Sequence, residues 1–141
     1  MAKTYPPFGC PFRYAASVIG DRWTLLILRD MVFKGFRSFG ELHQAGEGIS
    51  TNVLADRLAR LVASGMATKS PDPANASKLQ YRLTPKAHDF IPVLFEIALW
   101  SARHDERSDF PAPLLTRIQT DRDGFLREII ARSTDAATPP A

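Results

Sequence analysis

The sequence predicts a mainly α-helical fold with one small β-hairpin, and three observations support this prediction. Apolar residues recur at helical spacing in several segments, glycine and proline separate those segments, and one basic stretch alternates in the two-residue period of strands. The chain of 141 residues is long enough for one domain with a real core, and a second independent domain would be crowded. We therefore expect one compact unit with appendages.

Segment 12–33 predicts two helices that are broken at Gly20 and Asp21. Pro11 has the fixed φ that suits a first helical position, and Asp21 can cap the second helix. Apolar residues of the second helix, Trp23 among them, are too many for a single narrow stripe. We expect this helix to form the centre of the core.

Segment 38–45 predicts a short helix, because Ser38 can cap its start and Glu41 stands three positions later. The turn that follows contains Gly46 and Gly48, which tolerate the positive φ that a sharp corner between helices requires. A second helix then begins at the cap residue Ser50 and ends before a glycine at position 65.

The two faces of this second helix differ in chemistry. Leu54, Leu58 and Leu61 recur as an inward apolar stripe, and polar residues occupy the remaining arc. An α-helix fits the major groove of DNA, and its N-terminal turn approaches base edges and phosphates. The candidate DNA contacts on this helix are Ser50, Thr51, Asn52, Arg57 and Arg60, with Thr51 and Asn52 first for base readout and Arg57 beside them.

The stretches MATKSP and LQYRL alternate like strands, and a polar linker at 72–78 separates them. Two such strands make a hairpin, with Lys69 and Lys78 flanking its loop, where a wing tip would meet the DNA backbone or minor groove. Helix, glycine corner, helix and basic hairpin in this order form the layout of a winged helix-turn-helix. Each signal alone is also typical of a solvated surface, but their contiguity favours DNA binding.

Charge is distributed unevenly along the chain. Net charge is only +3, yet Lys and Arg outnumber Asp and Glu by 12 to 6 over residues 1–86 and are outnumbered by 6 to 9 over residues 87–141. This asymmetry directs positive potential from the proposed reading head toward a phosphate backbone. Double-stranded DNA is therefore the expected partner.

Thr84 and Pro85 predict the start of a long helix that runs to about Arg103, bent by Pro92 in its interior. One apolar side contains Phe90, Leu94 and Ile97, and another contains Ile91, Phe95 and Ala98. One side can cover the domain. We expect the other to pack against a second copy, unless the C-terminal segment folds back over it.

The C-terminal part of the chain predicts less structure. Residues 105–113 are charged and proline-bearing, which indicates a linker, and one short helix follows around Phe125 and Ile129. The tail 134–141 is expected to be disordered. We therefore divide the chain into a DNA-binding domain with dimerisation helices at 1–104 and an appendage at 105–141.

Composition and motifs argue against several other classes of protein. No apolar run approaches the roughly 20 residues of a membrane span and no secretory signal is visible, so a cytoplasmic protein without membrane contact is expected. One cysteine and three scattered histidines predict neither a metal site nor a cofactor. No nucleophile elbow or phosphate loop indicates an enzyme, and acidic pairs such as Asp121 with Asp123 are typically solvated.

Three stretches carry a resemblance to a known family: CPFRYAASVIGDRWTLLILRDM, FRSFGELHQAGEGISTNVLADRLARLVASGM, and YRLTPKAHDFIPVL with Trp100 closing the helix. Over residues 10–101 the chain resembles the HxlR-type bacterial winged helix-turn-helix transcriptional regulators, relatives of the MarR type. The resemblance implies a homodimer joined by its N- and C-terminal helices, with a recognition helix at 50–64 and a wing at 66–83. It also implies binding to a pseudo-palindromic operator, while the segment after Asp109 lies outside the match.

Cys10 precedes Pro11, so its sulfur is expected at a helix N-terminus, where the helix dipole and nearby Arg13 favour the thiolate. Some members of the resembled family sense oxidants or electrophiles through a cysteine at this position, so an oxidant or small-molecule effector is a hypothesis. A small buried cysteine without redox function is the alternative. For the whole chain, the alternative function is a winged-helix module that binds proteins without DNA, whose affinity would be flat across salt concentration.

Overall fold

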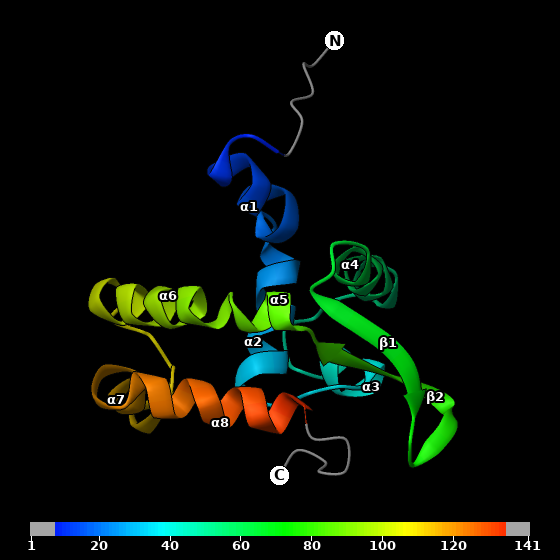
Figure 1. The fold of residues 1–141 in the computed structure, drawn as a ribbon. Helices are drawn as coiled ribbons and strands as arrows, with labels where there is room; N and C mark the ends of the chain where they lie inside the picture. Colours follow the sequence, from blue (N-terminus) through cyan, green and yellow to red (C-terminus); the bar gives the residue numbers. More distant parts are fainter. Residues whose placement is uncertain (1–7, 135–141) are drawn as a thin grey trace.

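The computed structural model describes residues 8–134 and is mainly helical with one hairpin, as the sequence predicted; the hairpin lies at the edge of the molecule (Figure 1). In chain order the elements are α1 (Pro11–Ile19), α2 (Arg22–Phe33), α3 (Phe39–His43), α4 (Thr51–Ala63), β1 (Ala67–Asp72), β2 (Asn75–Leu83), α5 (Pro85–His88), α6 (Ile91–His104), α7 (Ala112–Thr120) and α8 (Arg122–Thr134).

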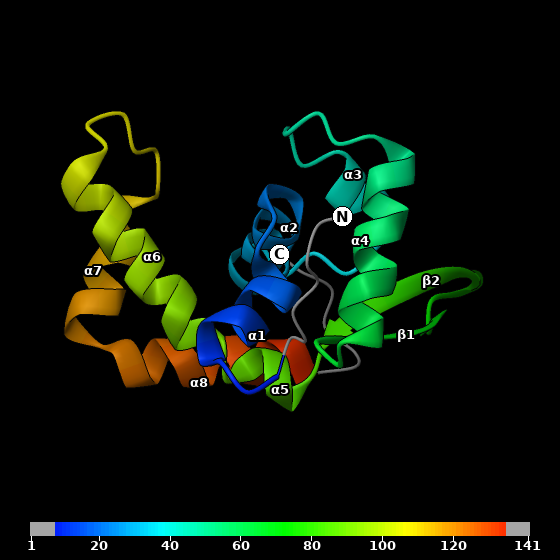
Figure 2. The same ribbon diagram turned by 90° about the horizontal axis from the view of Figure 1, so that it is seen from above.

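Helix α2 is the centre of the fold, which confirms its predicted role. It contacts α1, α4, α8 and β2, and its residues Ile27, Leu28, Met31 and Val32 are buried. Seen from above, α3, α4 and the hairpin lie on one side of α2, and α6 and α7 lie on the other (Figure 2). The helix-turn-helix elements and the C-terminal helices therefore occupy opposite sides of one central helix.

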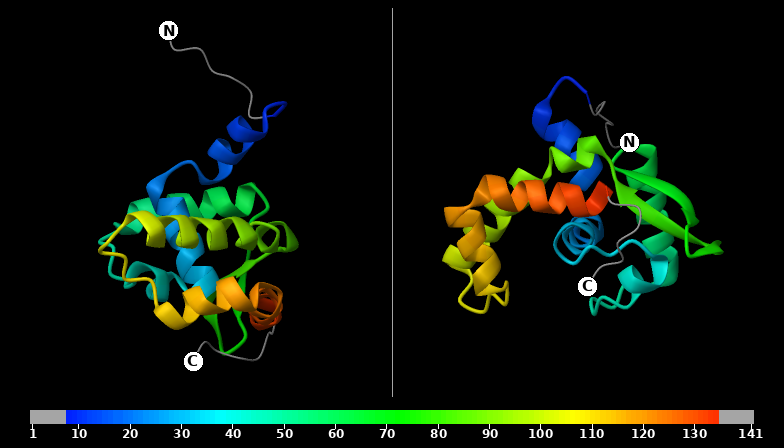
Figure 3. Two further views of the ribbon diagram at one scale, coloured as in Figure 1. Left: turned by 90° about the vertical axis from the view of Figure 1, so that its left-hand side faces the viewer. Right: turned by 60° about the horizontal axis from the view of Figure 1, so that its bottom comes forward.

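The break between α1 and α2 falls where the sequence predicted it. A Cβ on Gly20 would stand 2.2 Å from the carbonyl oxygen of Ala16, so the corner requires glycine. Asp21 caps α2 by accepting hydrogen bonds from the amides of Trp23 (3.0 Å) and Thr24 (3.1 Å). Helix α1 buries none of its residues and projects from the body of the molecule (Figure 3).

The two helices of the helix-turn-helix also match their local signals. Ser38 and Glu41 form the predicted capping box at the start of α3. Gly46 and Gly48 adopt φ values of +96° and +74° at the corner, where a side chain would be strained. Helix α4 begins after Ser50, whose hydroxyl accepts from the amide of Val53 at 3.2 Å.

The hairpin has a shorter loop than predicted. Only residues 73–74 lie between the antiparallel strands, so the prediction of a linker over 72–78 is wrong. The register shifts between Pro71 and Asp72, and residues 76–78 of β2 have no partner on β1. The base of the hairpin is fixed to the helix-turn-helix by the Tyr81 amide, which donates to the Arg37 carbonyl at 2.7 Å.

The long helix predicted after Thr84 is two helices. Helix α5 ends at His88, and α6 starts at Ile91 with Pro92 in its first turn. The expectation that Pro92 bends a helix from within is wrong, because the chain instead breaks before the proline and uses it as a helix start. The buried residues of α6 are Ile91, Leu94 and Phe95, so both apolar sides named from the sequence contribute to one core.

The C-terminal segment is more structured than the sequence indicated. Helix α7 was not predicted, and Ile118 on α7 is buried together with Phe125 and Ile129 on α8. All three belong to the same apolar cluster as the core of α2 and α6, and the rings of Phe95 and Phe125 stack at 5.4 Å. The division of the chain into a domain at 1–104 and an appendage at 105–141 stays a prediction. Of the tail predicted to be disordered, Thr134 is instead the last residue of α8, and residues 135–141 lie outside the described part of the chain.

Candidate nucleic-acid interface

Helix α4 presents the polar surface that the sequence predicted. Leu54, Leu58 and Leu61 are at most 1% exposed, while Thr51 and Asn52 are exposed in its first turn. Within residues 8–134, neither the Thr51 nor the Asn52 side chain forms a hydrogen bond, and both lie beside the amides that a helix leaves unpaired at its start. This first turn can therefore donate and accept hydrogen bonds with an external partner.

Arg57 lies differently from the other candidate contacts. Its Nε is 3.0 Å from Asp21 Oδ1 and its Nη1 is 2.5 Å from Asp56 Oδ2, and its side chain is 20% exposed. The guanidinium is therefore engaged by α2 and by its own helix. Whether it contacts bases stays a prediction, and such a contact competes with these two ion pairs.

The contacts of the Asp21 carboxylate, those from Thr24 before that from Arg57, also have an electrostatic signature. Burial alone would raise the pKa of Asp21, but hydrogen bonds from Thr24 and the Arg57 guanidinium outweigh it and lower that pKa to about 2. The Asp21 carboxylate is therefore charged at any pH at which the protein works. Sequence reasoning identified Asp21 only as a cap, because nothing local marks a partner 36 positions away.

Arg60 extends the polar face toward the end of α4. Its Nε lies 3.0 Å from Asp56 Oδ2, and its side chain is 64% exposed. Surface pairs of this kind are worth little, typically below about 1 kcal/mol, so the guanidinium can leave Asp56 for a phosphate.

Both wing lysines are exposed and, within the described residues, form no ion pair. Lys69 stands opposite Tyr81, and Lys78 lies in the part of β2 that has no strand partner. The loop beside Lys78 is ordered by its own side chains, since Asp72 accepts from the Ala74 amide at 2.8 Å and Asn75 accepts from the Ser77 amide at 3.1 Å. The two ammonium groups are thus held on a stiff hairpin next to α4.

Lys86 is a further cation near this surface and was not among the predicted contacts. Its Nζ donates to the Ser64 carbonyl at the end of α4 at 2.6 Å and lies 5.2 Å from the centre of the Tyr14 ring. Both contacts are internal, so Lys86 stabilises the end of α4 and links it to α1. The sequence signal that could have identified Lys86 is its position directly after Thr84 and Pro85, the capping residue and the first residue of a helix.

Cys10 is the N-cap residue of α1, as predicted, and is partly exposed. Hydrogen bonds from the backbone amides of Arg13 and Phe12 lower the pKa of its thiol below the ordinary value. A lowered thiol pKa raises the fraction of thiolate at the start of this projecting helix.

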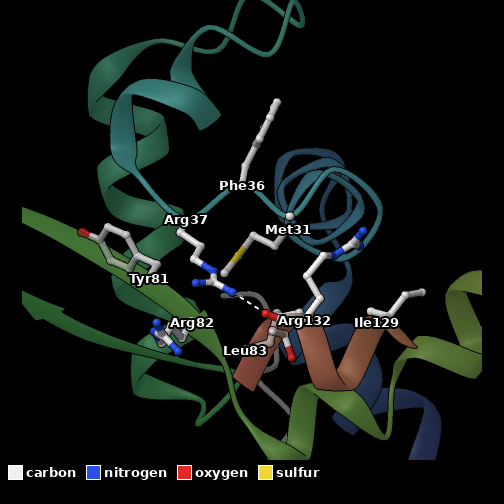
Figure 4. Close-up of a pocket in the computed structure, with 10 residues that line it drawn as sticks. Met31, Phe36, Arg37, Tyr81, Arg82, Leu83, Ile129 and Arg132 are labelled. Atoms are coloured by element: carbon white, nitrogen blue, oxygen red, sulfur yellow. Dashed lines mark hydrogen bonds between the residues drawn. The ribbon is translucent and has the colours of Figure 1, made fainter. Parts of the chain in front are cut away.

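Cavities within the described residues are small or open. The cavity between the hairpin base and the end of α8, about 10 Å³, lies where Arg37 donates to the Arg132 carbonyl (Figure 4). This volume holds one water at most. A larger recess, about 350 Å³, lies beside the corner between α3 and α4 and is lined in part by Arg29, Phe33 and Phe110. Neither cavity tests the hypothesis of an oxidant or small-molecule effector, which named Cys10 alone.

Residues 8–134 contain neither a membrane-spanning helix nor a cluster of metal ligands. No helix there is long and apolar enough to span a bilayer. No group of three or more His, Cys, Asp or Glu side chains in this part of the chain could hold a metal ion.

Comparisons with known proteins place this geometry in a family. The HxlR-like helix-turn-helix family model matches residues 18–109. The chain is 30% identical to the uncharacterised HTH-type transcriptional regulator sll1512 of Synechocystis, over 76% of this chain and 78% of that one. The crystal structure of PA1607, a proposed transcription factor, is similar with a TM-score of 0.65 and 36% identity, covering 74% of this chain and 71% of that one.

A second solved structure is similar over the same region. The transcriptional regulator YodB of Bacillus subtilis, in its reduced form, has a TM-score of 0.57 and 29% identity, covering 72% of this chain and all of YodB. YodB is also known in a diamide-treated form. The matched region contains the capped α3, the glycine corner, α4 and the hairpin. The chain therefore belongs to the HxlR-like helix-turn-helix family, with β1 and β2 as the wing of a winged helix-turn-helix.

Proposed function

We propose that this protein is a transcriptional regulator that binds double-stranded DNA in a sequence-specific manner as a homodimer. The observation that supports this most directly is the first turn of α4, where the Thr51 and Asn52 side chains are exposed and lack internal partners within residues 8–134. Relatives of this family are named HTH-type transcriptional regulators, which supports the same reading. A cytoplasmic location follows from this role.

The proposed contacts divide into two kinds. Thr51 and Asn52 read base edges in the major groove, where an amide side chain can form paired hydrogen bonds with adenine. Ser50, with the free amides of the first turn, lies against a phosphate. Arg60, Lys69 and Lys78 neutralise phosphates and raise affinity on every sequence.

A second copy is proposed to cover the exposed apolar residues of α1 and α6. Phe12 is 83% exposed and Tyr14 43% exposed on α1, and Trp100 is 61% exposed on α6. Aromatic side chains exposed this far are typical of a protein–protein interface. A symmetric dimer presents two copies of α4, so the operator should contain two half-sites about one helical turn or a multiple apart.

Substitution of Asn52 by alanine tests the DNA-binding proposal. A duplex is first selected by the full-length wild-type chain from a random-sequence pool, and binding of each variant to it is measured. Asn52→Ala should weaken binding by about 1–3 kcal/mol if it contacts a base, because the variant loses the amide that discriminates that base pair. Arg127→Ala, at an exposed position on α8, is the matched control and should bind as the wild type does.

Salt dependence separates DNA binding from the alternative of a protein-binding wing. The logarithm of the DNA affinity should fall with the logarithm of salt concentration with a slope of about −0.9 per neutralised phosphate. A DNA affinity that does not change with salt concentration would contradict the proposal. So would the selection of no duplex from the random-sequence pool.

Regulation through Cys10 is a second proposal, supported by the thiol pKa that the α1 amides lower. With one cysteine in the chain, oxidation would form a mixed disulfide with a small thiol or a bond to Cys10 of a second copy. Diamide treatment should change DNA affinity of the wild type and leave the Cys10→Ser variant unchanged. A thiol pKa near or above the free-cysteine value of about 8.5 would count against the switch.

A further inference from the structure

Asp21 joins two parts of the molecule that are far apart in the sequence. It lies at the corner between α1 and α2, directly after Gly20, and its carboxylate reaches Arg57 on α4, 36 positions later. Within residues 8–134, this is the ion pair that connects α4 to the start of α2. The apolar core holds α4 on α2, while this pair adds a polar contact at its edge.

The carboxylate of Asp21 is itself held in one orientation. Its Oδ1 accepts from the amides of Trp23 and Thr24, and its Oδ2 accepts from the Thr24 hydroxyl at 2.6 Å. Oδ1 also accepts from Arg57 Nε at 3.0 Å. An acceptor fixed by three hydrogen bonds from its own helix gives the Arg57 contact a defined direction.

The leucines of α4 cannot supply this direction. Leu54, Leu58 and Leu61 are fully buried and hold α4 on α2, but the hydrophobic effect that drives their burial is nondirectional. Asn52 and Thr51 must meet base edges within the narrow geometry of a hydrogen bond. A helix that reads bases therefore needs a directional contact as well as an apolar stripe.

We propose that Asp21 is a positioning residue for DNA binding: through Arg57 it fixes the orientation of α4 so that Thr51 and Asn52 face the groove. The inference rests on the proposed function and assigns Arg57 a role through Asp21 instead of a contact with a base.

Asp21→Asn tests this with little disturbance of the cap. Asparagine caps helices as well as aspartate does, but its neutral amide loses the charge-assisted contact with Arg57. The variant should bind the wild-type-selected duplex about three- to fivefold more weakly, the range expected for loss of a partly exposed ion pair. The substitution also removes a negative charge, which by itself would favour DNA, so a loss of affinity cannot come from net charge.

Asp56→Asn is the matched control. It makes the same change in charge and also removes a partner of Arg57, but Asp56 lies on α4 and cannot orient that helix relative to α2. Its affinity should equal or exceed that of the wild type. Equal binding by the Asp21→Asn and Asp56→Asn variants would overturn the inference.

Arg57→Ala distinguishes positioning from direct contact. If Arg57 acts through Asp21, the variant loses as much affinity as Asp21→Asn, the double variant loses no more than either single one, and the salt slope stays that of the wild type. A salt slope reduced by about 0.9, or tighter binding by Asp21→Asn because Arg57 is released, identifies a phosphate contact and overturns the inference.

Two measurements keep this result separate from stability and from the proposed function. Binding is measured well below the melting temperature of every variant, so that a purely structural loss appears in melting and leaves affinity unchanged. If the wild type selects no duplex, the proposed function falls together with this inference. If the wild type binds and Asp21→Asn binds equally well, only this inference falls.

Discussion

Helices α4 and α8 are both 13 residues long and both pack against α2, yet their polar groups have different partners. In the last turn of α8, Arg132 donates to the Val32 carbonyl at 2.6 Å and accepts from Arg37 through its own carbonyl. The hydroxyl oxygen of Ser133 lies 2.7 Å from His88 Nε2, at hydrogen-bond distance. In the first turn of α4, by contrast, the only side-chain hydrogen bond within the described part of the chain is the cap, in which the Val53 amide donates to the Ser50 hydroxyl.

This difference indicates how each helix is used. The polar groups that end α8 are bonded to three other parts of the molecule, α2, the segment before α3 and α5, so that end is an internal support (Figure 4). Helix α4 buries its leucines equally well but keeps the exposed arc of Thr51 and Asn52 available. Burial alone therefore does not distinguish a support helix from a recognition helix, whereas the pairing of polar groups does.

The largest expected effects test whether the two helices are equally part of the core. Leu58→Ala and Ile129→Ala should each lower the free energy of unfolding by about 2–5 kcal/mol, because both side chains are at most 1% exposed and truncation leaves a cavity. Denaturant unfolding measures both. If Ile129→Ala cost less than about 1 kcal/mol, α8 would be a loosely attached appendage and the comparison would fail.

A smaller loss of stability is expected where the end of α8 is bonded to Arg37, in the loop between α2 and α3, and to Val32 of α2. Arg132→Ala should cost about 1–3 kcal/mol of stability, because the variant leaves the Val32 carbonyl without its donor. Arg127→Ala, on the exposed side of the same helix, should change stability by no more than about 0.5 kcal/mol. Thermal unfolding of the pair checks this, and equal losses would mean that the Arg132 bond is not specific.

The wing provides the opposite case, a polar group expected to affect binding and not stability. Lys78→Ala should lower affinity alike for the selected duplex and for unrelated DNA, and should reduce the salt slope by about 0.9, since one phosphate contact is lost. Titrations at several salt concentrations measure both quantities. A loss confined to the selected duplex would instead make Lys78 a base-reading residue.

The smallest effect concerns acid stability at the junction of α2 and α4. The folded-state pKa of Asp21 is lowered from 3.8 to about 2, so its contribution is present above pH 3.8 and disappears as pH falls through about 2. Between pH 4 and 2, wild-type stability should therefore fall more steeply than that of Asp21→Asn. Parallel curves from acid titration would show that the charged Asp21 carboxylate, through its contacts with Thr24 and Arg57 together, adds nothing to folding.

Local signals in the sequence were sufficient for the helix starts. Asp21, Ser38, Ser50 and Thr84 cap helices as predicted, because a cap depends on residues only two or three positions away. The glycine corner before α4 followed from the same kind of information. The layout of the winged helix-turn-helix could therefore be predicted without tertiary contacts.

Non-local features could not be predicted in this way. The prolines at 111 and 113 resembled a linker and concealed α7, although Leu114, Leu115 and Ile118 follow at helical spacing. The contact between Asp21 and Arg57 depends on how α4 crosses α2, which no short window of sequence contains. The candidate site was thus predictable as a set of residues, but which of them is already bonded inside the protein was not.

The bond from Arg132 to Val32 spans 100 positions, and α8 closes over a central helix that is made early in synthesis. The surface of α2 beneath Phe125 and Ile129 therefore stays uncovered until translation has passed residue 129. Until then the nascent polypeptide presents a bare apolar patch, the kind of surface that chaperones bind and that promotes aggregation. Messages truncated before α8 should yield products that precipitate or are degraded.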